Sequence, residues 1–279
     1  MSGTLSVVAT PIGNLEDITL RALRVLREAQ LIAAEDTRRT AKLLNHYGIE
    51  TPTLSFHAHN SRARMPQLMA RLRAGAHVAL VTDAGTPGLS DPGAELVTAC
   101  RDEDIAVDPL PGASAALVAA VGSGFPLSPL TFLGFPPIKA KARAEWLSHL
   151  AASPSTVVFF EAPHRIAQML QALALCLGDR QICVGRELTK AHQEFVRGPA
   201  NDAKFTSITQ RGEFSIVVGP RLDSPGAFNE LSDSAIAEHF RSLDSGGGVA
   251  GRRRLIGEVA RHFGLTPNEV YQAIERTKV

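Results

Sequence analysis

Residues 78–93, VALVTDAGTPGLSDPG, join an apolar run to a loop rich in glycine and proline. The run at residues 78–81 has the length and apolar character of a strand covered on both faces, which is typical of a parallel sheet. Three glycines and two prolines then fall between residues 85 and 93 and impose a convoluted turn. Loops at the carboxyl ends of parallel strands are where open α/β sheets bind small molecules, so this stretch predicts a ligand site.

On either side of this loop, short β-branched runs alternate with helical patterns from residue 5 to about residue 122. Such alternation is typical of βα units on a parallel sheet. We expect strands at residues 5–9, 31–34, 53–56, 78–81 and 106–110. We expect helices at residues 19–29, 40–47, 62–74, 94–103 and 113–121. The pattern therefore predicts an N-terminal α/β domain over residues 1–122, with a five-stranded, mainly parallel sheet.

The segment GSGFPLS at residues 122–128 interrupts this alternation and marks the expected domain boundary. A second α/β domain at residues 123–222 is expected to hold a mixed sheet, because its strands follow one another closely near residues 182–219. Its expected strands are residues 130–134, 156–161, 182–185, 194–197 and 214–219, with helices at 144–151 and 166–177. A helical tail at 223–279 completes the chain, and Thr266, Pro267 and Glu269 predict the start of its last helix.

Composition narrows the class of protein. The 279 residues include 29 basic and 28 acidic side chains, so a net charge of +1 indicates no global preference for nucleic acid. No apolar run approaches the ~18 residues of a membrane helix, and no leader pattern opens the chain, so we expect a cytoplasmic protein without membrane contact. Cys100, Cys176 and Cys183 are scattered among apolar neighbours, which favours reduced, packed thiols over disulfides or a metal site.

The first loop, TPIGNLED at residues 10–17, holds one glycine where a dinucleotide-binding protein carries G-x-G-x-x-G. This argues against NAD and FAD, and the phosphate-binding P-loop pattern is also missing. The loop after residue 81 offers Asp83 and Asp91 but no cation, which suits a positively charged ligand such as S-adenosylmethionine. A purely structural loop is the alternative. Ser114 in the turn PGAS could be a second wall of the pocket or only a helix cap.

Eight short motifs occur in one order along the chain and together carry a resemblance. They are TPIGNLED, AEDTR (34–38), HAHN (57–60), DAGTPGLSDPG (83–93), PGAS (111–114), FFEAPHR (159–165), RELTK (186–190) and GEF (212–214). The chain resembles the bacterial 16S ribosomal RNA (cytidine-2'-O)-methyltransferases of the tetrapyrrole methylase superfamily. That resemblance implies two α/β domains with S-adenosylmethionine in the interdomain cleft, a homodimer, and a decoding-centre cytidine of the small ribosomal subunit as substrate.

The resemblance also implies which residues line the cofactor cleft. They are Pro11, Asp83, Ala84, Gly85, Leu89, Asp91, Pro111, Ser114, Leu188, Gly212 and Glu213. Superfamily members that methylate porphyrin or corrin rings share a glycine-rich first loop, which this chain lacks. A tetrapyrrole methylase is therefore the less favoured alternative, and a non-catalytic nucleic-acid-binding regulator is another.

A ribose 2'-hydroxyl is a weak nucleophile, so the reaction needs alignment and a group that accepts its proton, and it needs no metal. Several candidates follow expected strand ends: Asp36, His57, His59, Glu161, His164 and Glu187. We favour Asp36, paired with Arg38 for an RNA phosphate, over Glu161 or His57, although Asp36 could merely cap a helix. Clusters of Lys and Arg near residues 38–42, 62–64, 139–143 and 252–254 suggest RNA contact, although each alone also fits a solvated helix face. The tail has the pattern of a helix-turn-helix or, equally, of a generic helical hairpin.

Overall fold

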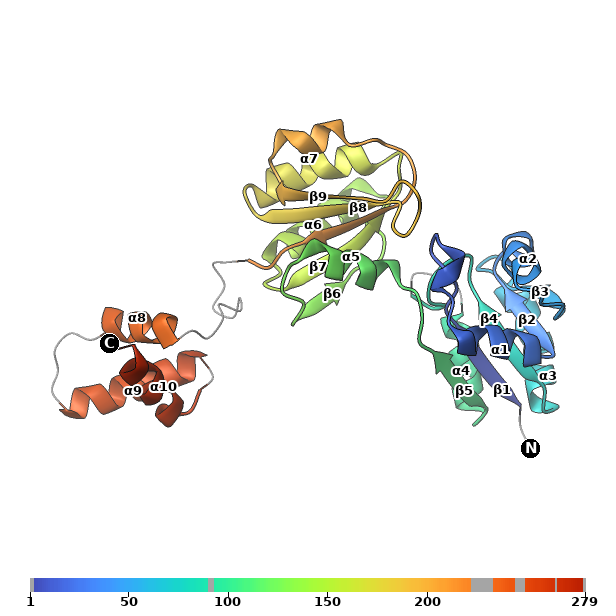
Figure 1. Cartoon of the computed structure of the whole chain (residues 1–279), viewed down its shortest axis with the longest axis horizontal. Helices are drawn as coiled ribbons and strands as arrows, with labels where there is room; N and C mark the ends of the chain where they lie inside the picture. The colour runs from blue at the N-terminus through green and yellow to red at the C-terminus, as the bar shows by residue number, and fades with distance from the viewer. Residues whose placement is uncertain (1–2, 90–92, 222–232, 244–248, 264, 278–279) are drawn as a thin grey trace.

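A computed structural model of the chain describes residues 3–89, 93–221, 233–243, 249–263 and 265–277. It contains two five-stranded sheets, each covered by helices, followed by a separate group of three helices (Figure 1). The prediction of an α/β protein with a C-terminal helical tail is therefore confirmed. Most strands begin and end within one or two residues of the expected positions.

The first sheet is entirely parallel, with strand order β3-β2-β4-β1-β5. Its strands are β1 (Thr4–Val8), β2 (Leu31–Ala34), β3 (Thr53–Ser55), β4 (His77–Val81) and β5 (Ala106–Leu110). The three central strands are buried almost throughout, because helices cover both faces of the sheet.

The helices of this sheet lie on opposite faces. On one face, α1 (Leu20–Glu28) and α2 (Thr37–His46) pack on side chains such as Val8 and Ile32. On the other, α3 (Ser61–Arg73) and α4 (Ala94–Asp102) pack on side chains such as Leu5 and Leu80. Within each strand, successive side chains point to opposite faces of the sheet, so neighbouring residues of one strand belong to different cores.

Strand order identifies where this sheet can bind a ligand. The connection that leaves β1 runs toward β2 on one side, whereas the connection that leaves β4 runs toward β5 on the other. The adjacent carboxyl ends of β1 and β4 therefore form a topological switch point, which is the usual binding crevice of an open α/β sheet.

The second sheet is mixed, with strand order β6-β7-β10-β8-β9. Its strands are β6 (Leu130–Phe132), β7 (Thr156–Glu161), β8 (Gln181–Arg186), β9 (Glu194–Pro199) and β10 (Phe214–Val218). Only β6 and β7 are parallel, and the other neighbours are antiparallel, as the close succession of these strands in the sequence suggests.

The helix α5 (Ala115–Ser123) follows the first sheet in the sequence but packs on the second. Its Ala116, Ala119 and Ala120 are buried against Val158 and Val217. On the opposite face lie α6 (Ala140–Ala152), α7 (Ile166–Leu177) and the short 3₁₀ turn Ala203–Ser207. The domain boundary at residue 122 stays a prediction, and the packing of α5 favours a boundary nearer residue 111.

The tail consists of α8 (Asp233–Leu243), α9 (Val249–Phe263) and α10 (Pro267–Arg276), which share one apolar core. The Glu269 N–H donates to Thr266 Oγ1 at 3.3 Å, and the Thr266 N–H donates to Glu269 Oε2 at 2.7 Å. This capping box confirms the predicted start of the last helix. The glycines at 246–248 lie outside the described residues.

Two further expectations concern membranes and thiols. In the described parts of the chain, no helix is both long enough and apolar enough to cross a bilayer. All three cysteines are free, and Cys100 and Cys183 are buried as expected. The prediction of a packed thiol is wrong for Cys176, because that residue lies on an exposed side of α7.

Candidate functional site

Three loops of the first sheet are tied together beyond its carboxyl edge. Thr10 and Gly85 exchange two backbone hydrogen bonds, each of 2.9 Å, which link the loops after β1 and β4. The Thr86 hydroxyl donates to the Ala113 carbonyl at 3.1 Å and joins the turn after β5. The loops at the switch point therefore form one connected surface.

Two glycines are required for this arrangement. Gly85 has φ of 81° and Gly93 has φ of 130°, a region that side chains with a Cβ rarely occupy. A Cβ on Gly93 would also lie 2.7 Å from Leu80 Cδ2, inside normal van der Waals contact. The glycine content that singled out this loop in the sequence thus has a direct conformational cause.

The second sheet contributes a loop that reaches the first. The Asn14 N–H donates to Thr189 Oγ1 at 3.1 Å, joining the loop after β1 to the loop after β8. In that second loop, Glu187 accepts from Lys190 Nζ at 2.8 Å and from the Glu213 N–H at 3.0 Å. The hydrogen bond from Lys190 holds the pKa of Glu187 below its usual value. Lys190 also pairs with the Glu213 carboxylate at 2.9 Å.

A cavity of about 340 Å³ lies between the part of the chain that holds the first sheet and the part that holds the second. Loops after β1, β4 and β5 form one wall, and residues near the ends of β6, β7 and β10 form the other. The lining residues are Ile12, Ala84, Gly85, Thr86, Leu89, Ser114, Ala115, Phe135, Phe160, Glu161, Ala162, Pro163, Glu213, Phe214 and Ser215. Apolar side chains dominate, and the charged groups among these residues are two carboxylates, so the cavity suits a partly apolar ligand with positive charge.

The cavity gathers six of the fifteen site residues that were predicted from the sequence. Those that line it are Ala84, Gly85, Leu89, Ser114, Glu161 and Glu213. Those that do not are Pro11, Asp36, Arg38, His57, Asp83, Pro111, Leu188 and Gly212. Leu188 instead belongs to the apolar core beneath α5, and Asp91 lies outside the described residues.

Ser114 has a hydroxyl group without a partner. The residue precedes α5 and is 7% exposed, but its side chain makes no cap hydrogen bond. Its Oγ is buried and has no hydrogen-bond partner within the described structure. The helix-cap explanation of this serine is therefore wrong. A buried polar group without a partner is costly, so this hydroxyl has a hydrogen bond to offer beside the cavity.

Glu161 is a buried carboxylate at the end of β7. Its side chain is 2% exposed, and its Oε1 accepts from the Ala162 N–H at 2.7 Å and pairs with Arg165 Nη2 at 2.5 Å. Within the described residues, all bonds of Glu161 go to Oε1. The carboxylate is therefore anchored by one oxygen, and Glu161 is one of the residues that line the cavity.

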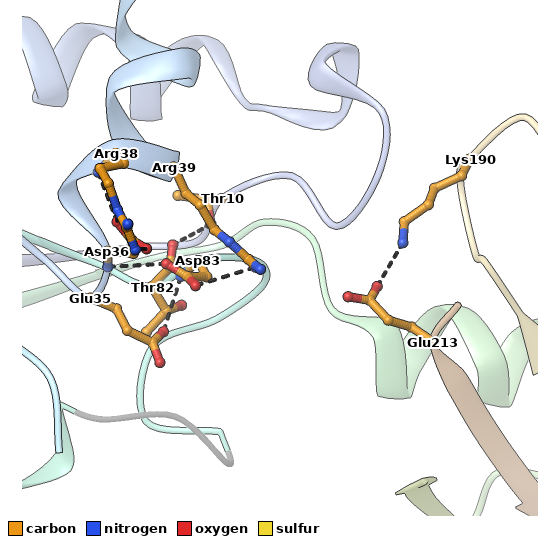
Figure 2. Close-up of polar contacts among 9 residues, drawn as sticks. All are labelled: Thr10, Glu35, Asp36, Arg38, Arg39, Thr82, Asp83, Lys190 and Glu213. Carbon is orange, nitrogen blue, oxygen red and sulfur yellow. Dashed lines mark hydrogen bonds and ion pairs between the residues drawn. The ribbon is translucent and has the colours of Figure 1, made fainter. Parts of the chain in front are cut away.

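Asp36 lies in a separate polar cluster at the ends of β2 and β4 (Figure 2). It caps α2, and both its oxygens accept from Arg38, the shorter bond being 2.7 Å. These bonds from Arg38 hold the pKa of Asp36 well below its usual range. The Asp36 N–H in turn donates to Asp83 at 3.1 Å, and Arg39 pairs with Asp83 at 3.3 Å. A carboxylate with a lowered pKa is a weak base.

We expect Asp36→Asn to fold normally and to keep most of any catalytic activity. Asparagine caps helices as well as aspartate does, whereas Asp36→Ala should lower the free energy of unfolding because the cap is lost. Because the folded-state pKa is depressed, the ionised carboxylate stabilises the fold above its unfolded pKa, and this is lost as pH falls through the lower folded pKa. Thermal melts between pH 2 and 7 test this, and an inactive but stable Asp36→Asn protein would contradict it.

His57 follows β3, which is an edge strand of the first sheet. β2 and β4 lie between β3 and β1. Its ring lies 6.0 Å from the ring of His59, and its Nδ1 is buried without a partner among the described residues. The structure therefore does not bring His57 to the cavity. Its catalytic role stays a prediction without geometric support.

Several lining residues were missed by sequence reasoning. Phe160 and Phe214 lie inside motifs that were quoted for their charged members, and Phe135 lies in a loop that no motif covered. Their position in the sequence could have pointed to them, because each of these residues lies at or beside the end of an expected strand. Strand order was not known from sequence, so these ends could not be placed beside the loop after β4.

Comparisons with known proteins agree with this geometry. The model of the family Tetrapyrrole (Corrin/Porphyrin) Methylases matches residues 4–204. The chain is 43% identical to Ribosomal RNA small subunit methyltransferase I of Synechocystis sp., over 97% of this chain and 96% of that protein. It is 47% identical to the protein of the same name from Bacillus subtilis, over 97% and 94%.

The fold is also found among solved structures. Uroporphyrin-III C-methyltransferase from Thermus thermophilus, complexed with S-adenyl homocysteine, aligns with a TM-score of 0.54 and 20% identity. That alignment covers 77% of this chain and 97% of the other. Because the curated relatives match nearly the whole chain, the chain belongs to the tetrapyrrole methylase family and, within it, to the ribosomal RNA small subunit methyltransferases I.

Proposed function

We propose that this protein transfers a methyl group from S-adenosylmethionine to the ribose 2'-hydroxyl of a decoding-centre cytidine in 16S ribosomal RNA. The relatives' names support a small-subunit ribosomal RNA substrate. The observation that carries the assignment of the site is Ser114, whose buried hydroxyl has no partner among the described residues and which lines a cavity with two carboxylates at the switch point of a parallel sheet.

The cavity residues fit this cofactor. Ser114 Oγ would supply a hydrogen bond, and Gly85 lets the backbone approach a ligand closely. Glu161 and Glu213 would favour the positive charges of the sulfonium and amino groups. Ile12 and Phe214 would cover apolar parts of the ligand. When bound, S-adenosylmethionine supplies an electrophilic methyl group on a sulfonium that departs as a neutral thioether.

The protein's own contribution is orientation and acceptance of a proton. Glu161 fits the second role better than Asp36, because Glu161 lines the cavity while both Asp36 oxygens are engaged by Arg38. Arg165 and the Ala162 N–H hold Glu161 through Oε1, so the free oxygen has a defined position. A held carboxylate within reach of a bound hydroxyl is the arrangement that general base catalysis needs.

Transfer of labelled methyl from S-adenosylmethionine to purified small ribosomal subunits tests the function. Mass spectrometric mapping should find one 2'-O-methylcytidine, and Glu161→Gln should lower its rate by at least about 100-fold, within the range that general bases contribute. Label on the base instead of the ribose would contradict 2'-O-methylation. No label on RNA, despite binding of the cofactor, would favour a ring methylase or a regulator.

We also infer a homodimer that works in the cytoplasm, where ribosomal subunits are assembled. The nine residues of α5 carry no charge, yet Leu117 is 57% and Val121 is 69% exposed on its outer side. Exposed apolar patches mark protein interfaces, and an uncharged patch can face its own copy without repulsion. Light scattering should report a dimer, and Leu117→Glu should shift it to monomer, whereas Leu175→Glu, on the surface of α7, should not.

A further inference from the structure

The loop between β6 and α6 presents an aromatic ring at the edge of the cavity. Phe135 lines the cavity and is 53% exposed, whereas Ser114 and Glu161 in the same cavity are 7% and 3% exposed. A large apolar side chain that stays half exposed at a binding site has surface left for a ligand. Phe135 therefore belongs to the rim of the cavity, outside its buried polar groups.

This ring is held in place by its surroundings. Phe135 packs edge-on against Phe160, with ring centroids 5.5 Å apart. The loop is fixed by a 2.8 Å hydrogen bond from the Phe160 N–H to the Gly134 carbonyl, and the next residue, Pro136, is buried. Because the loop is anchored at these points, Phe135 is held half exposed in the folded protein. One face of a positioned aromatic ring is thus presented at the cavity mouth.

Two lysines follow Phe135 within six residues in the sequence. Lys139 and Lys141 are exposed at the start of α6, and within the described residues neither forms a salt bridge. Proteins that bind single-stranded nucleic acid usually combine two features. Lysines contact the phosphate backbone, and an aromatic ring stacks on a base. Two exposed lysines suit a polyanion such as RNA better than the positively charged S-adenosylmethionine.

We propose that Phe135 stacks on the nucleobase of the target nucleotide and so positions its ribose at the cavity. The proposal rests on the proposed function and adds a positioning residue to it. Sequence-specific RNA recognition uses unstacked bases that rest on aromatic side chains, and one protein ring is enough for one base. A base held at the rim would direct its ribose toward the more buried Glu161 and Ser114.

Methyl-transfer kinetics on small ribosomal subunits test this role. Phe135→Ala should raise KM for the subunits about tenfold, the loss expected for one stacked base, while the Kd for S-adenosylhomocysteine by calorimetry stays unchanged. Phe135→Trp should restore KM, because it also offers a stacking face. Leu175→Ala, at a residue that is 89% exposed on α7, is the matched control and should behave as wild type.

Phe135→Leu guards against a folding defect, since leucine keeps the apolar contact with Phe160 but offers no ring face. It should share the raised KM of the alanine variant. An unchanged KM in both variants would overturn the proposal, and so would an equal loss of cofactor affinity, which would make Phe135 a cofactor residue. If the wild-type protein labels no RNA in the same assay, the proposed function itself is wrong.

Discussion

Ser114→Leu should abolish binding of S-adenosylmethionine and methyl transfer while leaving the protein folded. Leucine places extra carbon atoms where the Ser114 hydroxyl now lines a cavity of about 340 Å³, which is near the lower limit for a ligand of this size. It also removes the one buried hydroxyl of the cavity that lacks a partner among the described residues. Calorimetry with S-adenosylhomocysteine should show an affinity at least about 100-fold weaker than wild type, about 2.7 kcal/mol.

Ser114→Ala is the matched control, because it removes only the hydroxyl. Loss of one hydrogen bond of about 1 kcal/mol should weaken binding about fivefold. Ser114→Ala should not lower the melting temperature much, since the hydroxyl makes no bond within the described protein and caps no helix turn. Wild-type affinity in the leucine variant would show that the cofactor binds somewhere else.

Glu161→Ala should lower the free energy of unfolding by about 3 kcal/mol and remove activity as well. The Glu161 side chain is 2% exposed and its partner Arg165 is 17% exposed, so truncation leaves a buried cation unpaired. Breaking a buried ion pair from one side typically costs about 3–5 kcal/mol. Within the described structure, Arg165 forms no ion pair besides the one with Glu161, and its Nε has no partner, so no second anion compensates for the loss. Urea titration of both proteins measures the difference.

The double variant Glu161→Leu with Arg165→Met separates stability from activity. Replacing both members of a buried ion pair by apolar groups of similar size is often neutral, so most of the lost stability should return. Methyl transfer should not return, because the carboxylate that lines the cavity is still missing. A double variant that recovers both would reduce Glu161 to a structural role.

Local sequence decided much of the secondary structure. The apolar runs at β2 and β7 and the capped start of α10 form where the pattern predicted them, because burial, strand propensity and capping act over a few neighbouring residues. The glycines at 85 and 93 adopt the positive φ values that made their loop conspicuous. The motifs also placed the chain in its family before any geometry was known.

Tertiary structure alone decided which of these local features meet. Asp36 follows β2 and Glu161 ends β7, but strand order and the packing of the two sheets place only Glu161 at the cavity. Nothing in the local pattern distinguishes a serine that caps a helix from Ser114, whose hydroxyl is left unpaired. The reason is that strand neighbours, burial and hydrogen-bond partners depend on contacts between residues far apart in the chain, which a local pattern does not record.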